Sequence, residues 1–198
     1  MKPDILLSIT SGFLNILAFT IYNWKIIKGK ANPNITAWAL WAFITVLNFA
    51  SYKAMSGDWV KSLLPTVSSI QCIITFFLAL KTGAKKGGDR NDLLVFILGS
   101  IASIVWWSLK SATAANIMLQ LAITLGFIPQ FKSVWKKPES EIALCWFIWT
   151  SSFVLSTIVV ILRWRGQPQN LAYPVNCLWM HLTVALLATR SSQPITVS

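Results

Sequence analysis

Residues 5–21 of the chain read ILLSITSGFLNILAFTI, a stretch of apolar and small residues without a charge. It is long for the apolar core of a secretory signal and no small-residue cleavage site follows, so it is predicted to span a bilayer. A spanning helix needs about 20 predominantly apolar residues. The seven runs that meet this need cover residues 4–24, 36–55, 60–80, 93–109, 114–131, 141–162 and 171–189. The predicted fold class is therefore an all-α membrane protein with seven transmembrane helices.

The composition leaves little material for a water-soluble domain, because 55% of the 198 residues are hydrophobic and only 12% are charged. Soluble domains carry roughly 25% charged residues. In a soluble protein the formal net charge of +11 would suggest a nucleic-acid partner. Here the bases cluster between the apolar runs, so we interpret them as topology signals. The expected partner is the lipid bilayer, and no nucleic acid is expected.

The bases divide unevenly between the two sides of the predicted bundle, and the richer side is expected to face the cytoplasm. The richer side holds Lys25, Lys28, Lys30, Lys81, Lys85, Lys86, Arg90, Lys132, Lys136, Lys137 and Arg190. The poorer side holds Lys2, Lys53, Lys61, Lys110, Arg163 and Arg165. This division predicts an N-terminus outside and a C-terminus in the cytoplasm. The compact loops and short tails favour a bacterial inner membrane.

Two parts of the chain correspond at an offset of 107 residues. Lys25 and Lys30 after the first span match Lys132 and Lys137 after the fifth, and an aromatic-rich helix follows in both places. We interpret this as an internal repeat of three helices, with a linker helix between the copies (3+1+3). The predicted units are residues 1–80, a basic loop and linker helix at 81–113, and residues 114–198. Parallel repeats of this kind place a solute site near the bilayer midplane, between the units.

The end of the fifth span reads Gly126-Phe127-Ile128-Pro129-Gln130-Phe131-Lys132 and leads to Lys136-Lys137-Pro138-Glu139-Ser140. This stretch resembles the PQ-loop motif of the PQ-loop and SWEET superfamily of seven-helix transporters. In the last span, Pro174-Val175-Asn176 is similar to the proline and asparagine of the seventh helix in SWEET proteins. The resemblance implies a transporter that moves a small polar solute by alternating access, with a sugar as the leading substrate class.

Pro129 lacks a backbone N–H and clashes with the preceding turn, so it can kink a spanning helix. The resemblance implies that Pro129 is a hinge and that polar contacts position the neighbouring Gln130. In the first unit, Tyr22 and Asn23 stand where the motif has proline and glutamine. The alternative interpretation is that Pro129 marks the end of the fifth helix, just before a basic loop.

Asn176 is the first candidate for contact with the solute, because an amide in an apolar span offers both donors and an acceptor. The alternative is a hydrogen bond between helices. Ser68 and Ser69 hold the corresponding place in the third span and are expected to form a second polar wall. The resemblance points to Tyr52 as an aromatic that stacks on the solute. The remaining candidates are Asn48, Gln71 and, as a further aromatic, Trp149.

His181 is the only histidine and falls within the last span. Ionisable residues inside a membrane are functional hypotheses by default, and histidine titrates near neutral pH. His181 is therefore a candidate for solute binding or proton relay, against the alternative of a neutral histidine in helix packing. No Asp or Glu falls in the middle of a predicted span, which favours a facilitator over a proton-coupled transporter.

Other functions are weighed against transport of a sugar. Amino acids, vitamins and nucleosides are alternative solutes for a transporter of this type, and proton coupling through His181 is the alternative mechanism. A seven-helix sorting receptor would need several bases inside its cavity to bind a peptide carboxylate. Enzymatic activity, a metal and a cofactor are not expected, because the sequence lacks the residue clusters that they need. Association into a homo-oligomer is compatible with the sequence.

Overall fold

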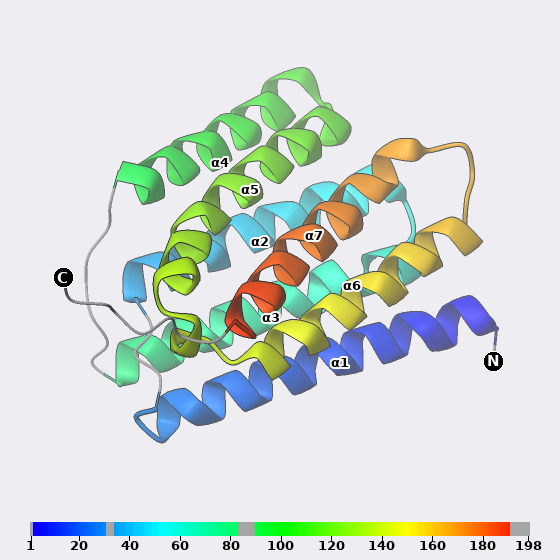
Figure 1. The fold of residues 1–198 in the computed structure, drawn as a ribbon. Helices are drawn as coiled ribbons and strands as arrows, with labels where there is room; N and C mark the ends of the chain where they lie inside the picture. Colours follow the sequence, from blue (N-terminus) through cyan, green and yellow to red (C-terminus); the bar gives the residue numbers. More distant parts are fainter. Residues whose placement is uncertain (1, 31–33, 83–89, 191–198) are drawn as a thin grey trace.

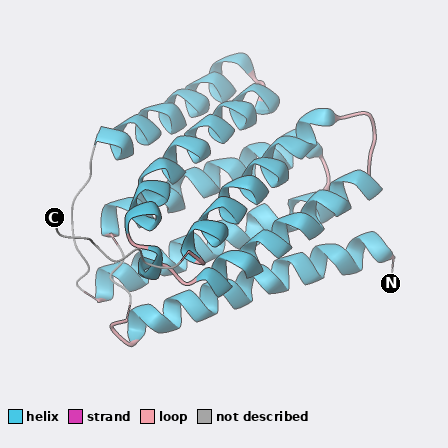
Figure 2. Cartoon of the chain, viewed as in Figure 1, coloured by secondary structure: helices cyan, strands magenta, loops and turns pink. Residues whose placement is uncertain are grey.

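The computed structural model describes residues 2–30, 34–82 and 90–190, and α-helices make up most of these ranges (Figures 1 and 2). The long helices are α1 (Pro3–Ile27), α2 (Ile35–Ser56), α3 (Trp59–Lys81), α4 (Arg90–Leu109), α5 (Ala112–Lys136), α6 (Ala143–Leu162) and α7 (Ala172–Ala188). Two short 3-10 helices, η1 (Pro138–Ser140) and η2 (Pro168–Leu171), precede α6 and α7. The all-α prediction is confirmed. Residues 83–89, with most of the predicted basic loop, lie outside the described residues.

Each of the seven long helices is long and apolar enough to cross a membrane. Large apolar side chains cover the outside of the bundle, including Phe13, Ile104 and Trp107, which are 62%, 62% and 81% exposed. So much apolar surface is unfavourable in water and favourable against lipid. The chain is therefore a membrane protein with transmembrane helices, as predicted.

Local sequence explains where the helices begin and end. Asn34 and Asp58 precede α2 and α3, and the side chain of each accepts hydrogen bonds from two backbone N–H groups of the first turn. Gly57 ends α2 with a φ of 62°, a left-handed conformation that glycine adopts without strain. The Gly57–Asp58 pair therefore reverses the chain between two spanning helices within two residues.

Tryptophans near the helix ends lie beneath basic side chains. The ammonium of Lys53 lies 3.9 Å from the ring centroid of Trp59, and that of Lys110 lies 5.5 Å from Trp107. Such pairs combine an aromatic ring suited to the headgroup region with a cation in water.

The fifth helix runs through Pro129 without stopping. The alternative interpretation, in which Pro129 ends this helix, is wrong, because α5 continues to Lys136. A proline leaves the carbonyl four residues earlier without its helical partner. Here that carbonyl, on Leu125, accepts a hydrogen bond of 3.0 Å from Nδ2 of Asn91 in α4. The neighbouring helix thus compensates for the interruption, as is required in hydrocarbon.

Each long helix packs against at least two others. α3 packs against both α1 and α2, and α7 packs against both α5 and α6. α6 also packs against α1, and α2 packs against α5. α4 lies along α5 and α2, at one side of the bundle (Figure 1).

Alanine substitutions of Gly57 and Gly12 test whether the positive φ of Gly57 matters for the stability of the turn. We expect Gly57→Ala to lower the free energy of unfolding by about 1 kcal/mol, because alanine is strained at positive φ. Gly12 lies inside α1, and a Cβ there meets Val67 at an ordinary 3.6 Å. Gly12→Ala should therefore leave stability unchanged or raise it by up to about 1 kcal/mol. Denaturant unfolding in detergent measures both, and equal effects would contradict this account of the turn.

Candidate functional site

A cavity of about 360 Å³ lies inside the helix bundle. Residues from α1, α2, α3, α5, α6 and α7 line it, together with Asn34 and Glu141 from the connections. The lining reaches the exposed residues Asn34 and Ser133 at one end of the bundle, and ends at the buried residues Asn15 and Tyr173 toward the other. We call these the Glu141 end and the Arg163 end. The cavity opens toward the Glu141 end.

Seven of the 21 described residues that line the cavity are tryptophan or phenylalanine. Phe19 of α1 contacts Trp149 of α6, with ring centroids 5.0 Å apart. Phe127 of α5 contacts Trp41 of α2 in the same edge-to-face manner at 5.2 Å. Phe19 also meets Trp38 at 6.2 Å. Each of these contacts crosses from one helix to another, so the rings tie the helices together around the cavity.

The same aromatic spacing occurs twice in the sequence. Phe127 contacts Trp146 at 6.1 Å, and this pair lies 108 residues after the pair of Phe19 and Trp38. A second tryptophan follows three residues later in both cases, at Trp41 and Trp149. Sequence reasoning missed this constellation, because it aligned the loops at an offset of 107. The repeated Trp-x-x-Trp spacing was the signal that would have revealed it.

Three buried polar atoms of the lining have no hydrogen-bond partner in the described structure: Oδ1 of Asn15, Oγ of Ser68 and Nε1 of Trp149. His181 is a further polar residue of the lining, and its Nδ1 lies 2.7 Å from the carbonyl oxygen of Cys177. Because a carbonyl only accepts, Nδ1 carries the proton, and Nε2 is the acceptor of the neutral ring. Buried polar atoms without partners are rare and are expected to serve a ligand or water.

His181 lies among aromatic rings. Its ring centroid is 4.7 Å from Phe153, 5.1 Å from Phe127 and 5.4 Å from Trp146. The histidine that was singled out in the sequence is therefore both in the cavity lining and at the centre of the aromatic cluster. Its roles in solute binding and proton relay stay predictions.

Glu141 supplies the carboxylate at the open end of the cavity. Its two oxygens accept hydrogen bonds from Nε2 of Gln130 at 2.8 Å and Nε1 of Trp146 at 2.9 Å. Burial raises the pKa of this carboxyl, and these two bonds work in the opposite direction. Gln130, predicted to be positioned by polar contacts, is thus held against the start of α6.

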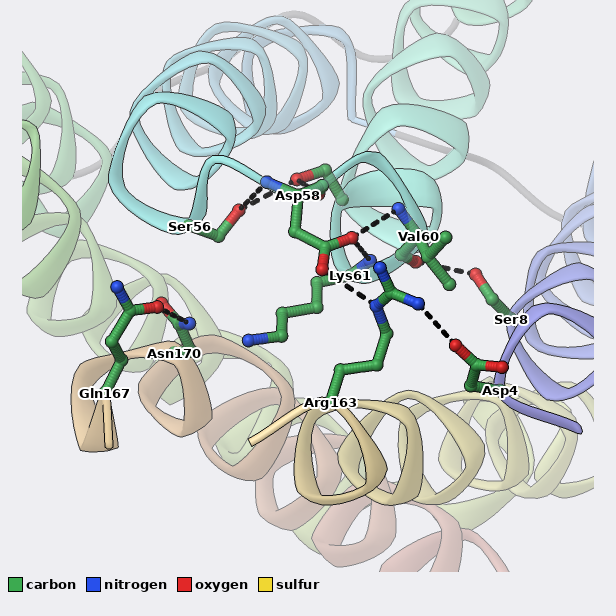
Figure 3. Close-up of polar contacts among 10 residues, drawn as sticks. Asp4, Ser8, Ser56, Asp58, Val60, Lys61, Arg163, Gln167 and Asn170 are labelled. Carbon is green, nitrogen blue, oxygen red and sulfur yellow. Dashed lines mark hydrogen bonds and ion pairs between the residues drawn. The ribbon is translucent and has the colours of Figure 1, made fainter. Parts of the chain in front are cut away.

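The Arg163 end of the bundle is closed by an ionic cluster. Figure 3 shows the Arg163 guanidinium between the carboxylates of Asp58 and Asp4. Nε of Arg163 donates to Asp58 at 2.7 Å, and Nη1 donates to Asp4. The cluster joins the start of α1, the turn between α2 and α3, and the end of α6. Nearby, the hydroxyl of Ser8 donates to the carbonyl of Val60 at 2.7 Å (Figure 3).

Charge pairing governs the titration of this cluster. Burial by itself would raise the pKa of Asp58, but the bonds from Arg163 and from the backbone N–H of Lys61 outweigh it and lower the pKa. The bond to Asp58 raises the pKa of Arg163. Both groups are therefore charged at neutral pH. The predicted topology placed Asp4, Asp58 and Arg163 near helix ends but did not pair them.

The predicted solute contacts divide into two groups. Ser68, Trp149 and His181 lie in the cavity lining. The other five lie outside it. Tyr52 donates from its hydroxyl to the carbonyl of Asn170 at 2.8 Å, and Ser69 donates to Thr66 within α3. Gln71 provides a backbone acceptor for Thr75. Their roles in binding, with those of Asn48 and Asn176, stay predictions.

Asn48 and Asn176 belong to a buried network of amides between α2, α5 and α7. Oδ1 of Asn48 accepts from Nδ2 of Asn116 at 3.1 Å and from Nε2 of Gln120 at 3.0 Å. Asn176 donates to the carbonyl of Gln120 at 3.1 Å and accepts from the hydroxyl of Thr124 at 3.0 Å. In a bilayer these amides have no water to bond, so their mutual bonds are needed to satisfy them.

The predicted hinge residues also have defined contacts. Pro129 lies inside α5, and the carbonyl of Leu125 that it frees is bonded by Asn91. The Tyr22 ring lies 5.5 Å from that of Trp38, and Oδ1 of Asn23 accepts from the hydroxyl of Thr75 at 2.9 Å. Asn23 thus links α1 to α3, whereas Gln130 links α5 to Glu141. The hinge role of these residues stays a prediction.

The described residues bring together no group of three His, Cys, Asp or Glu side chains that would hold a metal ion. The three cysteines, Cys72, Cys145 and Cys177, are buried thiols. What the cavity offers is therefore aromatic stacking and a few hydrogen bonds, which suit reversible binding of a small molecule.

No protein-family model matches the chain, and searches of curated proteins and of solved structures likewise give no match.

The amide network yields a stability prediction. Asn48→Leu removes the oxygen to which both Asn116 and Gln120 donate, so we expect the free energy of unfolding to fall by about 1–2 kcal/mol. Ser100→Ala is the control, because this exposed hydroxyl bonds only within its own helix, to Phe96. Unfolding by denaturant in detergent gives both values. Equal stability of Asn48→Leu and wild type would show that the network does not hold α2 to α5.

Proposed function

We propose that the chain is an integral membrane transporter that moves a small polar solute by alternating access. In this proposal α1–α3 and α5–α7 are two three-helix units in parallel orientation, and α4 is the linker helix between them. The observation that carries the proposal is the cavity, because residues of both units line it and it is open at one end and closed at the other.

The packing of the helices supports the division into units. In each unit the third helix packs against the other two, and the first and second helices of one unit pack against the second and first of the other. The matched aromatic contacts of Phe19 and Phe127 follow the same relation. Such a relation is expected of two copies that face the same way around an axis along the membrane normal.

In this proposal the closed end of the cavity faces outward. The Arg163 end holds few bases and the Glu141 end holds many, which favours a cytoplasmic Glu141 end, an external N-terminus and a bacterial inner membrane. The conformation described here is then open to the cytoplasm, and the Arg163 cluster is the external gate. Opening to the outside requires Arg163 to separate from Asp58 or Asp4.

The lining favours an uncoupled transporter over a sorting receptor. Among the described lining residues, Glu141 is the one carboxylate and no Lys or Arg occurs, whereas a receptor for a peptide carboxylate needs bases. Sugars are the leading substrate class by resemblance to the SWEET proteins, and amino acids, vitamins and nucleosides are the alternatives. Proton coupling through His181 is the alternative mechanism, favoured by its place in the lining.

Flux through proteoliposomes tests the function. We expect the purified protein to equilibrate radiolabelled glucose, or another solute found in a panel of sugars, amino acids and vitamins, faster than empty liposomes. Trp149→Ala removes a ring of the cavity wall and should lower the initial rate about tenfold. Trp107→Ala is the matched control, because Trp107 is 81% exposed on the lipid side. Absence of flux for every solute would contradict a transport function.

A second experiment tests the gate. Cys72 and Cys177 line the cavity, so a membrane-impermeant maleimide reports from which side it can be reached. In wild type we expect faster labelling from the Glu141 end. Arg163→Gln should raise labelling from the Arg163 end severalfold, because the ionic cluster is lost. Arg165→Gln, an exposed arginine two residues away, is the control. If Arg163→Gln were labelled from the Arg163 end at the wild-type rate, the cluster would not be a gate.

A further inference from the structure

The two units line the cavity with residues of different polarity at corresponding positions. At the offset of 108 set by the aromatic pairs, Asn15 corresponds to Ile123 and Thr45 to Phe153. Pro65 and Pro174 align α3 with α7 at 109, and Ser68 then corresponds to Cys177. All six residues lie in the cavity lining. At these three pairs the first unit supplies the polar side chain and the second an apolar one, whereas Gln130 and His181 of the second unit are the more polar members of their pairs with Tyr22 and Cys72.

The polar atoms without partners gather in one corner of the cavity. Asn15, Ser68 and Trp149 lie on α1, α3 and α6, three helices that pack against one another. They are only 1%, 6% and 4% exposed, so lipid and bulk water do not compensate them. Ser68 also interacts with Tyr173, but its Oγ makes no hydrogen bond of standard geometry. The corner therefore offers an acceptor on Asn15, a donor on Trp149 and a hydroxyl able to do either.

The opposite corner, between α2 and α5, is apolar. Ile123, Phe127 and Trp41 line it. Gly126 lets the Trp41 ring lie close, because a Cβ at Gly126 would meet that ring at 3.3 Å. The amides of Asn48, Asn116 and Gln120 on these helices lie outside the cavity lining and bond one another, and Gln130 lines the cavity only at its Glu141 end. These amides thus have partners on the α2/α5 side. The polar atoms of Asn15, Ser68 and Trp149 on the α1/α3/α6 side have no hydrogen-bond partner in the described structure.

We infer that the cavity selects an amphipathic ring solute that binds in one orientation. Its hydrogen-bonding edge meets Asn15, Ser68 and Trp149, and its apolar face lies on Ile123, Phe127 and Trp41. The inference rests on the proposed function and narrows its substrate class. A polyol hydroxylated on all sides fits less well, because its hydroxyls on the Ile123 side would lose their water without a replacement. Asn15 is then a specificity-determining residue.

A purely structural role for Asn15 and a role in solute binding predict opposite effects of Asn15→Leu on stability. If its amide stabilised the helix bundle, Asn15→Leu would lower stability. If Oδ1 is reserved for a solute, the ligand-free protein carries an unsatisfied buried acceptor, and Asn15→Leu should keep or raise the melting temperature while weakening binding. Stability without ligand and affinity are therefore measured on the same samples.

The test compares glucose with phenyl β-D-glucoside, which has one hydroxylated end and one apolar ring, by isothermal titration calorimetry on purified protein in nanodiscs. We expect the phenyl glucoside to bind wild type at least tenfold more tightly than glucose. Asn15→Leu should weaken its binding about tenfold. Ile123→Asn, which places an amide on the apolar wall, should narrow the difference between the two sugars. Thr20→Val, an exposed change on the same helix, is the control.

The outcomes separate the inference from the proposed function. Equal binding of the two sugars, or no binding of the phenyl glucoside, overturns the amphipathic class, while glucose flux in proteoliposomes still supports transport. A lower melting temperature of ligand-free Asn15→Leu overturns the role of Asn15. Tighter binding of the phenyl glucoside, weakened by Asn15→Leu at unchanged melting temperature, supports the inference whatever the flux experiment gives.

Discussion

The lack of water in hydrocarbon is the constraint on which this structure depends. A polar group inside the bundle must bond to another group of the chain, to a solute or to trapped water. The amides of Asn48, Asn116 and Gln120 bond one another, and the carbonyl that Pro129 releases is bonded by Asn91. The backbone N–H and C=O groups inside the helices bond one another. Against this background, the unpartnered atoms of Asn15, Ser68 and Trp149 mark the place where the bundle is incomplete without something bound.

The same constraint can be followed at the two interfaces α2/α5 and α1/α6. The interface between α2 and α5 is held by amides that would lose several bonds at once if they separated. Among the described residues, the side-chain polar contacts between α1 and α6 are the bond from Ser11 to the carbonyl of Ser152 and the ion pair of Arg163 with Asp4 at one end, and the rest of this extensive interface is apolar and aromatic packing. The two interfaces therefore differ in kind: amide bonds join α2 to α5, whereas packing joins α1 to α6 beside the cavity's polar corner.

The sequence predicts the helices well and the facing of their side chains poorly. Apolar runs of about 20 residues located all seven helices, because spanning a bilayer demands length and hydrophobicity whatever the packing. However, a buried asparagine looks the same in sequence whether it meets a cavity or another helix. Asn176, whose contact with solute stays a prediction, bonds Gln120 and Thr124, whereas Asn15, which was not a leading candidate, lies in the cavity lining.

The unequal helix lengths have a consequence for the surrounding lipid. α1 and α5 have 25 residues each and extend about 37 Å, whereas the last span, η2 followed by α7, has 21 residues. A hydrocarbon layer of about 30 Å is thinner than the length of α1 and α5. These longer helices therefore tilt or extend into the headgroup region. Acyl-chain length therefore acts on the relative angle of the helices, and membrane thickness becomes a physical variable that biases one conformation over another.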